Sequence, residues 1–595
     1  MFPLAAVAPT SANDWLYVGM PFLAYCLVVL NLAIFGEHGD ETNPLLIFFR
    51  RIGHSLRQMT GMPGWSMAGA LTGLTVLGVA AFGLYWDVAW HIDNGRDKNL
   101  FTPSHTMILL GLGGLVFAAT IAVIYATIER AEVGFRVLGV QVPWSALALG
   151  LLGVGGAAAF PLDDIWHKAY GIDVTLWSPT HLQLVAGGGL GPLAVWLMLR
   201  EGRSAGGRPN LFGKGIEVVA LGAILVGLSA FQGEFDFGVP QFQVLYLPIL
   251  LAAAAGMGLV IARIAMGAGG ALLAVVAFVI LRVIFALLVG GALNHTVPRF
   301  PLYLVAALAV EGVAWALGTD RRLRFALVAG AAVGSVGVAG EMVWVEVSGW
   351  ADVAGGEWPK ALLLGVVAAV AAALFGTGFA RAASPGGRIP VPALAVAGVA
   401  LVAAFAYPFP RTVGSAEAVI RLERVGDRAT VEVEMVPADA ADDATAFGIV
   451  SWQGGGRVSA SLDRVGPGRY ESSAPLPVTG SWKTMVGLQR GDQVMAAPIY
   501  MPADPEIGAP EVPAVAERRE PFVRDTDLLL RESKDGPTWP ALAAYAGVAL
   551  VTSLWFGVLA LAATRISPGA RPDPAVSGPD RPRTASAERP LTHSR

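Results

Sequence analysis

The sequence predicts an all-α polytopic membrane protein of about 13 transmembrane helices, with one extracytoplasmic β-sandwich domain inserted before the last helix. Three observations predict this class. First, 54% of the 595 residues are hydrophobic and only 14% are charged, whereas a soluble domain carries about 25% charged residues. Second, about thirteen apolar runs are long enough to cross a bilayer as helices. Third, one late segment alternates apolar and polar residues at a period of two, which is typical of strands.

The same composition excludes several classes of function. So much apolar sequence excludes a water-soluble enzyme, and a net charge of −4 provides no basic field that would attract nucleic acid. The single cysteine, Cys26, excludes an intrachain disulfide framework and a zinc site built from cysteines. Only eight histidines occur, so their positions are informative.

The predicted spans are apolar runs of about 17–25 residues. They cover residues 14–35, 66–86, 104–127, 143–160, 179–199, 215–231, 244–265, 270–291, 302–318, 324–341, 360–380, 391–407 and 539–563. We expect residues 1–200 to form an N-terminal membrane region and residues 201–409 a second group of membrane helices. The segment 539–563 is then the C-terminal transmembrane helix.

Lysine and arginine are concentrated in the loops on one side of these spans. Basic residues follow the first, fifth, ninth, eleventh and last spans, whereas the opposite loops are acidic. Basic loops stay in the cytoplasm. We therefore expect a multi-pass protein of the cell membrane with its N-terminus and β domain outside and its C-terminal tail inside. The first residues lack a basic n-region, so we expect no cleavable signal peptide.

The segment 410–510 predicts the extracytoplasmic β-sandwich. Residues 418–423, 430–435, 447–452 and 457–462 alternate at a period of two, and glycine-rich turns separate them. Residues 511–538 are rich in proline, glutamate and arginine, and they read as a linker to the last helix. The tail 564–595 is rich in proline and arginine, which predicts disorder.

Two loops on the predicted outer face repeat one pattern, D-x2-W-H-x3-G-x-D-x5-P-x-H. The first copy runs from Asp87 to His105 and the second from Asp163 to His181. Seven positions are identical at a constant offset of 76 residues. Chance would give about one such identity in a window of this length, so the pattern indicates a duplicated unit of helix, loop and helix.

Each copy predicts a metal site made of two histidines and one carboxylate. Residues four apart share one helix face, and a histidine just after a proline falls in the first turn of the next helix. The predicted ligand sets are Asp87, His91 and His105 in the first copy, and Asp163, His167 and His181 in the second. Such sets suit copper, and zinc or iron less well, and they leave a coordination position open. Asp97 and Asp173 are placed to orient a ligand histidine.

Other interpretations of the repeat remain open. The residues fit solvated Asp–His ion pairs in outer loops, a bis-histidine haem site, or a proton or quinol relay without a metal. Haem is disfavoured because its histidines usually face each other deep in the hydrocarbon. Glu234, Asp236 and His295 lie on the same predicted face and are possible additional site residues. Glu311 and Glu341 lie in or beside apolar spans, where a glutamate is a functional candidate.

The two copies resemble the C subunit of the copper membrane monooxygenases, the family that includes particulate methane and ammonia monooxygenases. The likeness covers about residues 60–200 and rests on Asp-x3-His and a following His in each copy. It implies two copper sites near the outer face, where O2 is activated to hydroxylate a small apolar molecule or ammonia. The family has asparagine at the position of Asp163, and the first copy has one extra residue between its histidines.

The chain also departs from that family. The family's C subunit is shorter and works with A and B subunits, whereas here more helices and a β domain follow in one chain, as in a fusion. The run from Pro467 to Lys483 resembles small YtkA-like β domains that accompany copper and oxidase proteins. The insert is not a blue-copper domain, because no cysteine follows Cys26 and no histidine lies between His295 and His593.

Two functions compete at this point. The first is a copper-dependent monooxygenase, or a subunit of one, that receives electrons from a quinol or another redox partner. The second is a non-catalytic copper-binding, trafficking or assembly protein of the membrane that serves another oxidase. The expected partners are membrane lipid, other monooxygenase-type subunits or a second copy of the chain, and no nucleic acid. A transporter is disfavoured, since its ligands would lie in broken helices at mid-membrane depth.

Overall fold

The computed structural model describes residues 44–95, 101–171, 175–240, 243–349, 357–384, 390–409, 414–454, 456–505, 507–534 and 536–566. Among these residues, ten helical stretches are long and apolar enough to cross a membrane. Predicted spans from 66–86 onwards each coincide with a helix, and the predicted span 14–35 lies outside the described residues. The multi-pass helical architecture is confirmed, and the count of thirteen spans stays a prediction.

Nine of the ten stretches precede the β domain. They are α3 (Gly64–Asn94), α4 (Pro103–Ile128), α5 (Trp144–Tyr170), α6 (Pro179–Ser204), α7 (Leu211–Ser229) with η1 (Ala230–Gln232) and α8 (Gly233–Asp236), α9 (Tyr246–Met266), α10 (Gly270–Ala286) with η2 (Leu287–Ala292), α12 (Arg322–Ala332) with η3 (Val333–Gly337) and α13 (Val338–Val347), and α14 (Trp358–Ala382). The tenth is α17 (Thr538–Arg565). Two shorter apolar helices, α11 (Leu304–Leu317) and α15 (Val391–Ala406), match the predicted spans 302–318 and 391–407.

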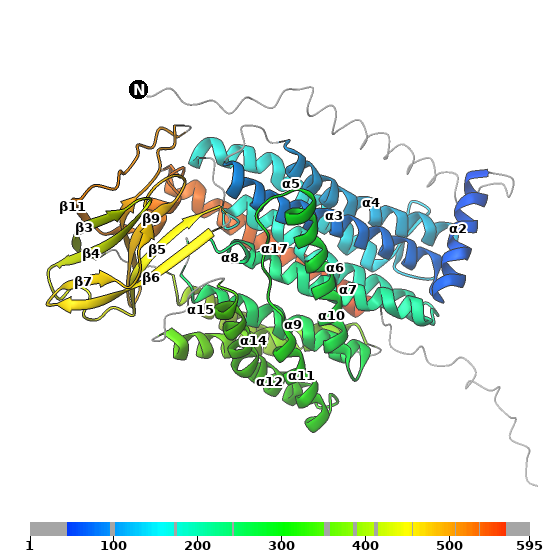
Figure 1. Cartoon of the computed structure of the whole chain (residues 1–595). Coiled ribbons are helices and arrows are strands. Elements are labelled where there is room, and N and C mark those ends of the chain that lie inside the picture. Colours follow the sequence, from blue (N-terminus) through cyan, green and yellow to red (C-terminus); the bar gives the residue numbers. More distant parts are fainter. Residues whose placement is uncertain are drawn as a thin grey trace, which may run out of the picture.

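The helices form two groups that meet at α7. The first group contains α3, α4, α5 and α6, with α17 against α5 and α6, and the second contains α9, α11, α12 and α14. Helix α7 contacts α6 on one side and α9 and α10 on the other. Figure 1 shows the β domain at one end of these helices and α2 (Pro44–Thr60) at the opposite end.

Small residues allow the close approach of these helices. A Cβ atom added to Gly189 on α6 would lie 2.7 Å from the carbonyl oxygen of Gly227 on α7, and one added to Gly256 on α9 would lie 2.6 Å from that of Ala369 on α14. Any larger side chain would therefore push the backbones apart. This is the packing that lipid favours, because helices there associate through backbone proximity.

Three glutamates at or near the ends of helices cap neighbouring helix starts. Both carboxylate oxygens of Glu311 accept backbone N–H bonds at the start of α10, and those of Glu341 accept from the residues that precede α11. Glu201 does the same for α5. Helix starts carry N–H groups without intrahelical partners and a positive dipole end, so these glutamates have a structural role here.

The β domain follows α15 and consists of antiparallel strands. They are β3 (Glu417–Val425), β4 (Arg428–Val436), β5 (Ala446–Gln453), β6 (Gly456–Gly466), β7 (Arg469–Ser472), β8 (Leu476–Pro477), β9 (Lys483–Arg490), β10 (Gln493–Tyr500), β11 (Glu517–Pro521) and β12 (Val523–Arg524). The four strands predicted from alternation are confirmed as β3 to β6. Their inward side chains, such as Ile420, Val433 and Ile449, are buried in one core.

The β domain is barrel-like, which differs from the predicted β-sandwich. The strand order is β11-β3-β4-β7-β6-β5-β9-β10-β12, and β8 pairs with β4. Because only Phe522 separates β11 from β12, one chain segment pairs with both edge strands, β3 and β10. This segment lies in 511–538, the expected linker. The segment was not predicted as a strand because its side chains are charged. Arg519, for example, pairs with Glu417 on β3, and such side chains are polar because they face water.

Three local elements were not predicted. Helix α2 carries basic residues that the sequence placed in a loop, and its apolar face packs on α3, α4 and α7. A short hairpin of β1 (Phe135–Val137) and β2 (Val140–Val142) joins α4 to α5. The five-residue helix α16 (Asp525–Leu529) lies between the barrel and α17.

Candidate metal centre

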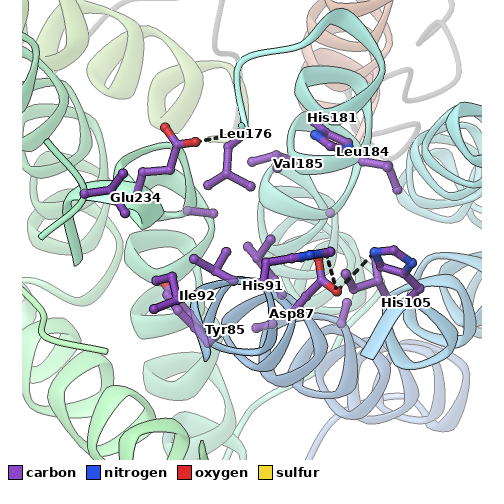
Figure 2. Close-up of a pocket in the computed structure, with 18 of the residues that line it drawn as sticks. Tyr85, Asp87, His91, Ile92, His105, Leu176, His181, Leu184, Val185 and Glu234 are labelled. Atoms are coloured by element: carbon purple, nitrogen blue, oxygen red, sulfur yellow. Dashed lines mark hydrogen bonds and ion pairs between the residues drawn. The ribbon is translucent and has the colours of Figure 1, made fainter. Parts of the chain in front are cut away.

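The first cluster is assembled at the facing ends of α3 and α4. Asp87 and His91 lie one turn apart near the end of α3, and His105 lies in the first turn of α4. Both histidine Nε2 atoms face the same carboxylate oxygen: Oδ1 of Asp87 is 3.6 Å from His91 and 3.1 Å from His105. The three predicted residues are thus brought together, as Figure 2 shows.

The second cluster repeats this geometry at the facing ends of α5 and α6. Asp163 and His167 lie near the end of α5, and His181 lies in the first turn of α6. The Nε2 atom of His167 is 3.6 Å from Oδ2 of Asp163, and that of His181 is 3.3 Å from Oδ1. The duplicated sequence therefore produces duplicated geometry.

Matching caps fix the helix ends in both copies. Gly95 and Gly171 end α3 and α5 with positive φ angles of 82° and 92°, which favour glycine. Each donates its N–H to the carbonyl of the cluster histidine four residues earlier. At the next helix, the hydroxyls of Thr102 and Ser178 accept the N–H groups of His105 and His181.

A hydroxyl at the same position in each copy orients the carboxylate, and sequence reasoning did not identify it. Ser104 donates to Oδ1 of Asp87 at 2.7 Å, and Thr180 donates to Oδ1 of Asp163 at 2.6 Å. Serine and threonine differ in name but supply the same donor. A hydroxyl residue therefore recurs at the offset of 76 residues, but a count of identical residues does not include it.

Backbone carbonyls select the ring nitrogen that faces each carboxylate. Nδ1 of His91 lies 3.1 Å from the carbonyl oxygen of Gly95, and Nδ1 of His181 lies 2.6 Å from that of Thr175. Since a carbonyl only accepts, Nδ1 carries a hydrogen, and in the neutral ring the lone pair then lies on Nε2. This arrangement is common for metal-binding histidines.

The two clusters fit a metal ion by distance and by donor type. In each, one ligand atom from each of the three residues lies within 4.8 Å of the others. Two ligands that hold one ion at about 2.0–2.2 Å and a tetrahedral angle are about 3.3–3.6 Å apart, which matches most of the Nε2–carboxylate distances. In addition, the buried Nε2 atom of His167 has no hydrogen-bond partner among the described residues. The residues fit two metal sites but do not determine which metal.

Both clusters line one cavity of about 540 Å³ between the helices and the β domain. The β domain covers one end of the cavity with residues that include Trp452 on β5, Gly454 in the β5–β6 turn and Lys483 at the start of β9. The contact is close, because a Cβ atom added to Gly454 would lie 2.8 Å from the carbonyl oxygen of Ile92 on α3. The clusters are therefore enclosed between two parts of the chain.

The other predicted site residues have separate positions. Glu234 lines the same cavity, whereas Asp236 is buried in an ion pair with Arg282 at 2.6 Å and does not line it. His295 is 3.0 Å from the Asp93 carboxylate, at the end of α3. Asp97 and Asp173 lie outside the described residues, so their predicted role stays a prediction.

Glu234 reaches the second cluster through the loop that precedes α6. Its Oε1 atom accepts the N–H of Leu176 at 2.9 Å, a contact drawn in Figure 2. The neighbouring carbonyl of Thr175 accepts from Nδ1 of His181. Glu234 therefore holds the peptide segment that orients a ligand histidine.

Comparison with known proteins identifies no relative: no family model, no curated protein and no solved structure matches the chain. The function of the chain is therefore inferred from the site itself.

Proposed function

We propose that this chain is a copper-binding membrane protein that holds one copper ion at each Asp-His-His cluster and oxidises, with O2, a substrate held in the adjoining cavity. The observation that carries the proposal is the pair of matching clusters that open onto one enclosed cavity. The resemblance to the C subunit of the copper membrane monooxygenases points in the same direction.

The donor set supports copper over other common divalent ions. Imidazole suits copper well, and copper lies above zinc, iron and manganese in the general order of affinity. His91 and His105 would hold the first ion and His167 and His181 the second, with Asp87 and Asp163 as the oxygen ligands. Copper, when bound, supplies one-electron and O2 chemistry.

The protein's own residues then prepare the site. Ser104 and Thr180 each donate a hydrogen bond to Oδ1 of the carboxylate in their cluster. This bond fixes the carboxylate, and its remaining lone pairs face the histidines. Apolar side chains such as Leu112 and Phe160 line the cavity beside the clusters. They exclude water, which strengthens electrostatic interactions inside the site. Three protein ligands leave a position for a small molecule at each ion.

Metal analysis and O2 uptake test the proposal together. The full chain, purified in native lipid, should contain two copper ions and consume O2 when a short-chain quinol is supplied. The variant His91→Ala with His167→Ala should lose both properties. His54→Ala is the matched control, since His54 lies on α2 and bonds only to Gln58 among the contacts described. Two bound copper ions without O2 uptake would instead support copper storage or trafficking.

A further inference from the structure

The cavity beside the clusters is elongated along the helix axes. Its lining positions on α3 recur every three or four residues, and so form one stripe on one helix face. This stripe includes Leu74, Leu77, Gly78, Ala81, Leu84 and Val88. Leu74 lies 17 residues before His91, which is about 25 Å along a helix. The hydrocarbon core of a bilayer is about 30 Å thick, so the cavity follows most of the membrane.

A second stripe on α7 and η1 forms a further wall. It consists of Val219, Ala223, Val226, Gly227 and Ala230. Small residues on both walls leave the space open: a Cβ atom added to Gly78 would meet no atom within 4 Å. Protein interiors are otherwise close-packed, and a cavity of this volume is typical of a ligand site.

Polarity is separated along the cavity. The carboxylates, imidazoles and lysines of its lining all lie at the end with the clusters and the β domain. Between the start of α3 and Tyr85, the α3 stripe is apolar. The Tyr85 hydroxyl accepts a hydrogen bond from buried Arg282. Val219 lines the cavity and is 40% exposed, so this part of the wall is not close-packed.

We propose that this cavity binds an amphiphile from the membrane that has a single hydrocarbon chain and a small head without negative charge. The chain would lie between the stripes on α3 and α7, and the head would lie beside the two clusters. A chain is favoured because the space is long, narrow and apolar. The seven carboxylates of the lining outnumber its two lysines, so the charge of the cavity disfavours an anionic head. Only the contact between head and metal depends on the proposed function.

Photolabelling of the full chain tests this binding without any measurement of activity. The probe is hexadecanol that carries a diazirine near either its hydroxyl end or its methyl end, in phosphatidylcholine nanodiscs. The methyl-end probe should label peptides that contain Gly78 and Val219, and the hydroxyl-end probe should label peptides near His181. Gly78→Phe should lower this labelling at least about tenfold, because the ring and the chain would overlap.

Matched variants keep the test decisive if one of them folds poorly. Gly113→Phe on α4 is the control, since Gly113 is exposed, lies outside the cavity and has equally open space at its Cβ. Ala223→Phe blocks the cavity from the opposite wall and should repeat the effect of Gly78→Phe. Labelling spread over lipid-facing helices, or unchanged in both blocked variants, would overturn the proposal. Equal labelling by the palmitic acid analogue, whose head is anionic, would overturn the exclusion of a negatively charged head. Either result leaves the copper content of the wild type, and so the proposed function, as a separate measurement.

Discussion

Replacement of Glu234 by leucine should weaken metal binding at the second cluster and leave the first unchanged. The side chain acts through the N–H of Leu176, and the adjacent carbonyl of Thr175 orients His181. Leucine has a similar size but cannot accept a hydrogen bond. The loop would then lose the contact that holds it, and His181 would lose its fixed orientation.

The size of the effect follows from the buried N–H group. Leu176 is buried, and a buried donor left without an acceptor costs about 1–3 kcal/mol. Since each 1.4 kcal/mol is about tenfold in affinity, the second site should bind its metal about 5- to 150-fold more weakly. Loss of such an orienting contact typically costs about 10–100-fold in metal affinity, so the two arguments agree.

Competitive titration of the purified full chain with Cu(I) and a chelator would measure both sites in one experiment. Glu234→Gln should bind nearly as the wild type does, because its amide oxygen still accepts from Leu176. Glu217→Leu is the control for a lost buried glutamate, since Glu217 lies at the far end of α7 and pairs with Arg203. Equal affinity of Glu234→Leu and the wild type at both sites would refute the reasoning.

Three further outcomes are expected. His105→Ala should remove the first metal and retain the second, and His181→Ala should do the reverse in metal analysis, because their ligands come from different helix pairs; loss of all metal from either would indicate one shared binuclear centre. Burial raises the pKa of the Asp525 carboxyl to about 7, above its value of about 3.9 in an unfolded chain. The β domain should therefore lose stability as the pH rises from about 4 to 7, and Asp525→Asn should remove this loss when hydrogen exchange of β10 and β12 is compared at pH 5 and pH 8. A cysteine at position Lys168 should react with an impermeant thiol reagent added outside the cell, and reaction only from the cytoplasmic side would contradict the predicted orientation.

The helical part of the fold was predictable because each span depends on local sequence. An apolar run of sufficient length must form a helix in lipid, where every backbone group needs an internal partner. The β domain was predictable only in part. Strands β3 to β6 alternate clearly, but β11 has charged side chains on a solvent-facing edge, and its pairing with β3 depends on residues about 100 positions away. Composition assigned that segment to a linker for this reason.

The grouping of the cluster residues was predictable from the repeat, whereas the contacts that support them were only partly so. Asp87, His91 and His105 lie within 19 residues, so helix geometry and one tight turn suffice to bring them together. The role of the Ser104 hydroxyl was not predicted, because the second copy has Thr180 at this position and the two residues are not identical. The contact from Glu234 to Leu176 spans 58 residues, and no local pattern predicts it.

The two clusters are therefore equivalent in local geometry but not in their surroundings. The second is held by Glu234 and by the segment before α17, where the N–H of Lys534 donates to the carbonyl of Tyr170 at the end of α5. Near the first, Asp93 instead bonds His295 and Thr296 from the loop after α10. A gene duplication copies the ligands and their caps, which are close in sequence, but it cannot copy contacts to the rest of the chain. Metal ions proposed for the two clusters should consequently be bound with different affinities, although the ligand types are the same.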